Sequence, residues 1–219
     1  PSRLVGSEMC IRDRFKVEFE CEFLGSVNTL INPSKLKNLV YENPIQKNAG
    51  LDVYEAPQKD HNYLITVDVA RGLGNDYSAF IVFDITNFPY KAVAKYRNNE
   101  IKPMLFPSII DDIGKAYNKA FILCEVNDIG DQVASILNYD LEYDNLLMCS
   151  QRGRAGQVVG AGFSGKRSQL GVRTTQAVKK LGCSNLKTLL EDDKILIIDY
   201  DIISELTTFS QKHNSFEAE

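Results

Sequence analysis

The chain has 219 residues, of which 44% are hydrophobic and 25% are charged, and its formal net charge is −4. These values are typical of an ordinary globular protein and argue against a generally basic DNA-binding protein. No apolar run approaches the roughly 20 residues of a membrane-spanning helix, so we expect no membrane partner. The five cysteines are scattered without a C-x-x-C pair, which argues against a zinc knuckle.

The first sixty residues carry few signs of a compact domain. Residues 1–14, PSRLVGSEMCIRDR, show no helical or strand period and resemble a translated adapter sequence, so we expect them to be foreign to the fold. Residues 32–60 contain two Asn-Pro pairs and one Ala-Pro pair, which is typical of loops and linkers. We therefore predict that the compact domain spans residues 61–219.

Apolar segments follow one another closely from there on. Three strands come first, and a glycine-containing turn, RGLGND, predicts that the first two form a hairpin. Helices and strands then alternate, which indicates an α/β domain with a mixed sheet flanked by helices. The predicted strands are 63–70, 78–85, 91–97, 120–126, 145–149 and 194–199, and the predicted helices are 103–117, 128–139, 174–193 and 202–209.

Two carboxylates lie inside apolar, strand-like runs. Asp68 lies in YLITVDVA and Glu125 in AFILCEVND. A buried charge is costly unless something pairs with it, and hard oxygen ligands on neighbouring strands suit Mg²⁺ or Mn²⁺. Asp76, in the turn after Asp68, is either a further ligand or an ordinary turn aspartate. Asp84 is interpreted as a solvated strand end, and from the residues alone Asp68 and Glu125 could also be strand-end charges.

Residues 151–190 contain no acidic residue, and in an acidic chain such a window indicates either a polyanion site or a solvated face. The candidate DNA-binding residues in it are Arg152, Arg154, Lys166, Arg167, Arg173, Lys179 and Lys180. The same window holds GAGFSGK, which nearly matches a phosphate-binding loop, and ILIID (195–199) resembles the strand that accompanies such loops. Arg167 stands where the metal-binding hydroxyl belongs, which argues against an NTPase.

Three segments together resemble the C-terminal nuclease domain of T4-like large terminase subunits, the DNA-packaging motors of tailed phages. They are ITVDVARGLGNDYSAFIVFDIT, FILCEVNDIGDQVA and GVRTTQAVKKLGCSNLKTLLEDDKILI, in this order. The resemblance implies an RNase H-like fold and an endonuclease that hydrolyses DNA phosphodiesters with two Mg²⁺ or Mn²⁺ ions. It implies that Asp68 and Glu125 are catalytic metal ligands and that Asp76 is an additional ligand.

The resemblance also implies partners and a location. These are double-stranded DNA, an N-terminal ATPase domain, the portal protein and the small terminase subunit, in the host cytoplasm during phage assembly. Residues 15–60 then correspond to the end of the ATPase region and a linker. The third catalytic aspartate of the family is expected after Glu219, so we expect a C-terminally truncated domain with weak or absent cleavage.

Two other functions stay open at this stage. One is another RNase H-like nuclease, such as a resolvase or transposase core, for which a preference for branched DNA would be the sign. The other is a non-catalytic module that clamps DNA or docks on the portal, for which DNA binding would persist in EDTA.

Overall fold

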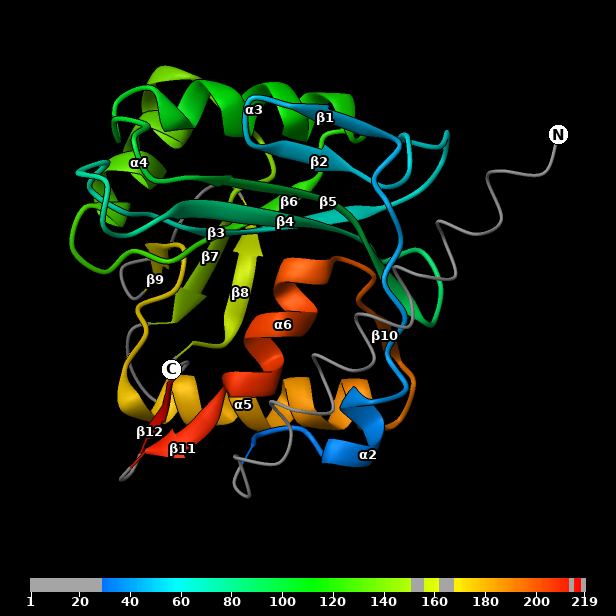
Figure 1. The fold of residues 1–219 in the computed structure, drawn as a ribbon. Helices are drawn as coiled ribbons and strands as arrows, with labels where there is room; N and C mark the ends of the chain where they lie inside the picture. The colour runs from blue at the N-terminus through cyan, green and yellow to red at the C-terminus, as the bar shows by residue number, and fades with distance from the viewer. Residues whose placement is uncertain (1–28, 151–155, 162–167, 213–214, 218–219) are drawn as a thin grey trace, which may run out of the picture.

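The computed structural model describes residues 29–150, 156–161, 168–212 and 215–217. Its strands form one large mixed sheet and two small antiparallel sheets (Figure 1). In spatial order the large sheet contains β1 (Gln46–Asn48), β2 (Leu51–Val53), β5 (Tyr90–Asn98), β4 (Ser78–Asp84), β3 (Tyr63–Asp68) and β6 (Phe121–Cys124), and β10 (Ile195–Leu196) pairs with β5. The small sheets contain β7 (Leu147–Ser150) between β8 (Val158–Ala161) and β9 (Ser168–Leu170), and β11 (Ser210–Lys212) with β12 (Ser215–Glu217).

Helices cover both faces of the large sheet (Figure 1). On one face lie α3 (Phe106–Ala116), α4 (Gly130–Ser135) and the π-helical turn η1 (Ile136–Asp140). On the other lie α5 (Gln176–Glu191), α6 (Tyr200–Thr208) and the short α2 (Pro33–Leu36). None of the helices in the described ranges is both long and apolar enough to span a membrane.

The predicted hairpin is confirmed, because β3 and β4 pair antiparallel from Tyr63 opposite Asp84 to Asp68 opposite Ala79. Along β3, buried Tyr63, Ile65 and Val67 alternate with less buried residues, which is the pattern of a strand with one face in the core. A crossover through α3 then brings β6 back parallel to β3. This parallel pair places the carboxyl ends of both strands at the same edge of the sheet.

The main core lies between the sheet and α3. Phe80 of β4, Tyr96 of β5 and Phe106 of α3 stack on one another, with ring centroids 5.1 to 6.1 Å apart. Phe106 and Ile110 are one helical turn apart and fully buried, so α3 presents one apolar stripe to the sheet. These contacts hold the sheet against α3. Polar side chains project from the edge of the sheet that is held in this way.

A second core joins the start of the described chain to its end. Leu30, Ile31 and Leu36 are buried against Leu190 of α5 and Ile203 of α6. The sequence places residues 32–60 in a linker, whereas the structure places β1 and β2 of this segment in the large sheet. The assignment of residues 1–14 as foreign and of 15–60 as the end of an ATPase region stays a prediction.

A buried ion pair fastens α6 to the sheet. The Lys95 ammonium of β5 lies 2.7 Å from Asp199 and 2.6 Å from Asp201, and the Tyr54 hydroxyl donates to Asp199 at 2.5 Å. Asp199 also caps α6, accepting from the Ile202 N–H at 2.9 Å. Burial alone would raise the pKa of Asp199, but the bonds from Lys95 and Tyr54 hold it below its ordinary value.

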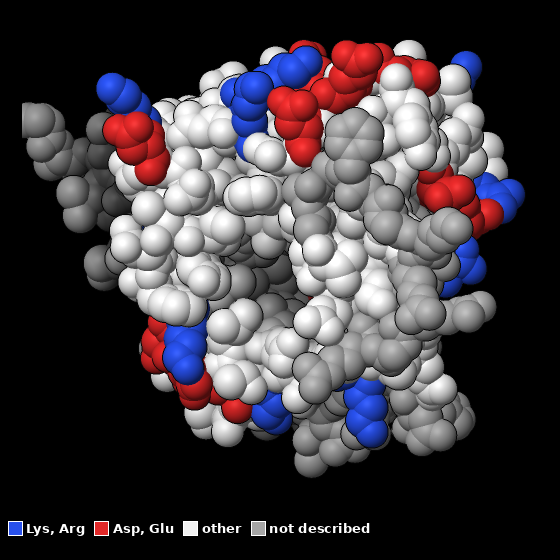
Figure 2. Space-filling view, turned by 180° about the vertical axis from the view of Figure 1, so that it is seen from behind, with Lys and Arg blue, Asp and Glu red and all other residues white. Residues whose placement is uncertain are grey.

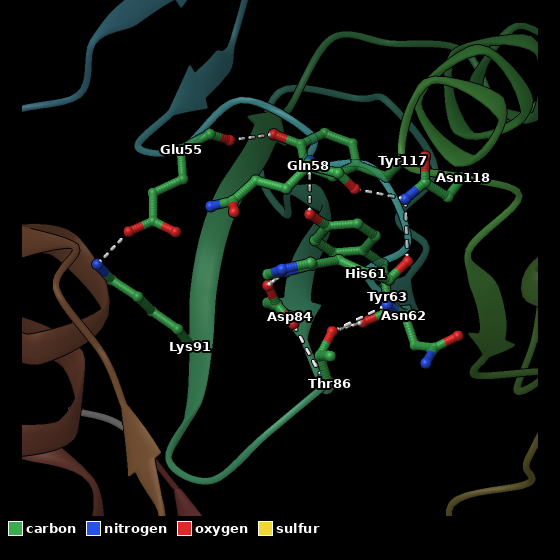
Figure 3. Close-up of polar contacts among 10 residues, drawn as sticks. All are labelled: Glu55, Gln58, His61, Asn62, Tyr63, Asp84, Thr86, Lys91, Tyr117 and Asn118. Carbon is green, nitrogen blue, oxygen red and sulfur yellow. Dashed lines mark hydrogen bonds and ion pairs between the residues drawn. The ribbon is translucent and has the colours of Figure 1, made fainter.

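A polar cluster lies at the open end of the β3–β4 hairpin, away from the turn that joins the two strands (Figure 3). The His61 ring lies 2.5 Å from the Asp84 carboxylate, which also accepts from the Thr86 N–H at 2.9 Å. Burial would raise the pKa of Asp84, but the bonds from Thr86 and His61 lower it. The interpretation of Asp84 as a solvated strand end is therefore wrong, because only 14% of its side chain is exposed.

Candidate metal centre

Asp68 and Glu125 come together because their strands are parallel neighbours. Val67 pairs with Cys124 in the register of β3 and β6, and the Glu125 N–H donates to the Val67 carbonyl at 2.9 Å. Asp68 is the last residue of β3, and Glu125 directly follows β6. The two carboxylates therefore leave the same edge of the sheet at adjacent positions. The expectation of a buried charge is wrong for Asp68, which is exposed at the end of β3, while Glu125 is half-buried.

The electrostatics of Asp68 reflect this closeness. Neighbouring atoms remove part of the water around its carboxyl, and the negative charge of Glu125, within hydrogen-bonding reach, adds to this effect. Together they raise the pKa of Asp68 above its ordinary value. A divalent cation between the two acids would instead favour the ionised form of both carboxyl groups. Their oxygen atoms are therefore suitable ligands for a hard metal ion.

Asp76 lies in the exposed turn between β3 and β4, and its charge contributes further to the raised pKa of Asp68. Within the described ranges, no group of three or more His, Cys, Asp or Glu side chains is arranged to hold a metal ion. The structure thus brings Asp68 and Glu125 together, while a ligand role for Asp76 stays a prediction.

A tight turn follows Glu125 and leads into α4. The Gly130 N–H donates to the Asn127 carbonyl at 3.0 Å, and a Cβ on Gly130 would overlap the backbone carbonyl of Glu125. Only a glycine lets the chain turn back this closely. Within this turn the Asn127 side-chain amide donates to Glu125 Oε1 at 2.9 Å, a contact that the sequence reasoning missed.

A bidentate ion pair joins the two turns that follow the acids. Arg71, three residues after Asp68, donates through Nε and Nη2 to the two carboxylate oxygens of Asp128, both at 2.8 Å. Asp128 stands three residues after Glu125, and both side chains are more than half exposed. The pair therefore ties the β3–β4 turn to the β6–α4 turn beside the acids.

Part of the window without acidic residues, 151–190, lies next to this centre. It is the segment that leads into α5. Val172 forms an isolated bridge with Glu125, so the exposed Arg173 stands one residue away from that pairing. Lys179 and Lys180 lie in the first turns of α5, with Lys180 exposed and Lys179 half-buried. The other candidate DNA-binding residues, Arg152, Arg154, Lys166 and Arg167, lie outside the described residues.

Figure 2 shows the face of the molecule opposite the view of Figure 1. The middle of this face is hollowed, and the described charged side chains lie around its margin. Most of the lysine and arginine side chains drawn there neighbour acidic ones, so the described residues of this face form no continuous basic surface.

The NTPase alternative finds no support in ILIID. Its aspartate, Asp199, is buried and is already bonded to Lys95, Tyr54 and the N-terminus of α6. Gly160 and Ala161, the start of GAGFSGK, belong to strand β8, and the remainder of that motif lies outside the described residues.

A family model described as the terminase RNaseH-like domain matches residues 65–219, which is most of the chain and includes both acids. The chain belongs to this family. The match agrees with the predicted fold, an α/β domain with a mixed sheet flanked by helices, and with the resemblance seen in the sequence.

Solved structures of phage terminase nucleases share the fold of this terminase domain. The large terminase nuclease of thermophilic phage G20c with bound magnesium has 20% identity and a TM-score of 0.65, over 89% of both chains. Its cobalt-bound form has 21% identity and a TM-score of 0.64, over 88% of this chain and 89% of that one. The Thermus phage P74-26 large terminase nuclease domain has 22% identity and a TM-score of 0.59, over 85% of this chain and 80% of that one.

Proposed function

We propose that this terminase domain is an endonuclease that hydrolyses DNA phosphodiesters with Mg²⁺ or Mn²⁺, two ions in the complete site, during genome packaging. The observation that carries the proposal is the convergence of Asp68 and Glu125 at the carboxyl ends of β3 and β6. The metal-bound terminase nucleases of the same fold support it.

The two acids share one task in this proposal, which is to hold the metal ions. When bound, the divalent ions supply an activated water and stabilise the leaving oxygen of the cleaved phosphodiester. Asp68 and Glu125 hold the ions from two adjacent strands, which fixes both ligands on rigid elements rather than on loops. Asp76 would add a ligand from the β3–β4 turn.

The test of this function is a nicking assay on supercoiled plasmid DNA. We expect nicking with Mg²⁺ or Mn²⁺ and none in EDTA, and the assay is run on this chain and on a chain extended past Glu219. DNA binding without cleavage by the extended chain would instead support a non-catalytic clamp. Cleavage restricted to branched DNA would support a resolvase-like nuclease.

We propose that DNA reaches the acids along the segment between Val172 and α5. Arg173 stands beside the Glu125 pairing, and Lys180 is exposed in the first turns of α5. Phosphate contacts from such residues give affinity that depends on salt and little on sequence. Within the whole motor, this domain would work beside an ATPase domain, the portal and the small terminase subunit in the host cytoplasm.

Substituting Arg173→Ala and Lys180→Ala should weaken binding to a short duplex. The logarithm of the association constant falls as the logarithm of the salt concentration rises. Each lost phosphate contact should make this slope shallower by roughly 0.9. Fluorescence anisotropy across a salt series measures this slope. Lys119→Ala is the control, because Lys119 is also exposed and pairs with Asp144, but it precedes β6 whereas Glu125 follows that strand, so it lies at the opposite end of the strand from the acids. Equal slopes for all variants would contradict this path for the DNA.

A further inference from the structure

The Asn127 side chain links one acid of the centre to the start of α5. Its Nδ2 donates to Glu125 Oε1 at 2.9 Å and to the Thr174 carbonyl at 3.0 Å. Both acceptors lack a hydrogen, so the opposite orientation of the amide would place an oxygen against two other oxygens. The amide orientation is therefore fixed by its two partners.

The backbone around Asn127 leaves this side chain little freedom. Its carbonyl accepts from the Gly130 N–H, and the turn closes against the Glu125 carbonyl, where only a glycine fits at position 130. On the other side, Val172 is bonded to the backbone of Cys124 and Val126, at 2.8 and 2.9 Å, so the segment carrying Thr174 is held in place as well. Asn127 is half-buried between these two fixed segments.

We propose that Asn127 is a positioning residue that holds the Glu125 carboxylate against Asp68 for a shared divalent cation. This inference rests on the proposed function. The terminal torsion of a glutamate is broad, so an unanchored carboxylate would sample many orientations. A single N–H donor restricts that rotation, and an ionised carboxylate with about four lone-pair sites still has acceptor capacity for a metal.

A purely structural role is the competing explanation. In that case Asn127 would matter only through Thr174, by holding the start of α5. Thr175→Ala separates the two roles, because Thr175 caps α5, accepting from the Val178 N–H at 3.3 Å, and has no contact with Glu125 among the described bonds. It loosens the start of α5 and leaves the amide of Asn127 in place.

The experiment measures Mn²⁺ affinity without any cleavage, from the electron paramagnetic resonance signal of free Mn²⁺ during titration of the chain. We expect Asn127→Ala to raise the Mn²⁺ dissociation constant roughly 10- to 100-fold, the range for loss of a group that orients a metal ligand. Thr175→Ala should stay within about twofold of the unsubstituted chain, because it leaves the Glu125 contact intact. Asn127→Ser, which cannot reach both acceptors, should match Asn127→Ala and replaces it if the alanine variant does not fold.

The outcomes separate this inference from the function on which it rests. Unchanged Mn²⁺ affinity of the Asn127 variants, with affinity lost in Asp68→Asn, would overturn the positioning role alone. An equal loss in Thr175→Ala and Asn127→Ala would also overturn it, in favour of the structural role. Unchanged affinity in Asp68→Asn would instead contradict the proposed function.

Discussion

Replacing Asp68 by Asn should abolish metal-dependent nicking of DNA. The substitution keeps the size of the side chain but removes the charge where the ends of β3 and β6 converge. A metal ligand and its partners act as one unit, so we expect a loss on the order of a thousandfold or more. The assay is nicking of supercoiled plasmid in Mg²⁺ or Mn²⁺, with the chain extended past Glu219.

The same substitution should leave the fold intact or make it more stable. The raised pKa of Asp68 means that its ionised form is penalised by lost water and by Glu125. A group with a raised acid pKa costs stability once the pH is above its ordinary pKa, so the neutral Asn relieves this cost at pH 7, and the gain is small because Asp68 is exposed to solvent. A denaturation midpoint at or above that of the unsubstituted chain would separate lost chemistry from lost folding.

Asp84→Asn is the matched control for this experiment. Asp84 is also a strand aspartate of the same hairpin, but it lies at the far end, bonded to His61 and Thr86 (Figure 3). Its lowered pKa shows that its charge stabilises the fold, so Asp84→Asn should lower stability modestly and keep cleavage. Undiminished cleavage by Asp68→Asn, or equal losses in both variants, would contradict the assignment of Asp68.

The convergence of Asp68 and Glu125 was open to prediction because it depends on local patterns. Each acid closes an apolar run, and the hairpin followed by an alternation of helix and strand favours a mixed sheet. The contact with Asn127 was harder to predict. It depends on the turn that Gly130 allows and on Val172 arriving from a distant segment, and neither follows from the spacing of residues.

Asp84 was misinterpreted because its partner lies on another segment. Asp84 is paired with His61 from the preceding segment, just as Asp199 of ILIID is paired with Lys95 of β5. A sequence pattern shows an acid near an apolar run but not the hydrogen-bonding partner that reaches it across the sheet. Likewise, the sequence predicts a linker at β1 and β2 because both segments are short. Their place in the large sheet depends on the pairing of β2 with β5, which lies far along the chain.

Removing Asp199 should produce the largest loss of stability. The Lys95 side chain is only 7% exposed, and Asp199 is the buried acid that neutralises it. Asp199→Ala would leave Lys95 with Asp201 and the more distant Asp52, remove the acceptor of the Tyr54 hydroxyl, and uncap α6. Breaking one side of a buried pair costs about 3–5 kcal/mol, which is a large share of the stability of a domain. Urea denaturation followed by circular dichroism measures the loss.

The pH dependence of stability tests the same ion pair without a substitution. The pKa of Asp199 is lowered, so its contribution is present above its ordinary value of 3.8 and is lost as the pH falls through the lower folded value. Burial would lower the pKa of Lys95, but the bonds to Asp199 and Asp201 raise it, so its contribution is lost as the pH rises past 10.5 through the folded value.

An exposed pair supplies the comparison for both experiments. Lys119 lies 3.4 Å from Asp144, and both side chains are more than half exposed, so Lys119→Ala should cost less than about 1 kcal/mol. If Asp199→Ala cost no more than this control, Lys95 would have to reach solvent, and the ion pair could not be what fastens α6 to the sheet. Helices α5 and α6 share the second core, so a loosened α6 should also weaken the packing of Leu190 in α5. The first residues of α5 lie beside the metal centre.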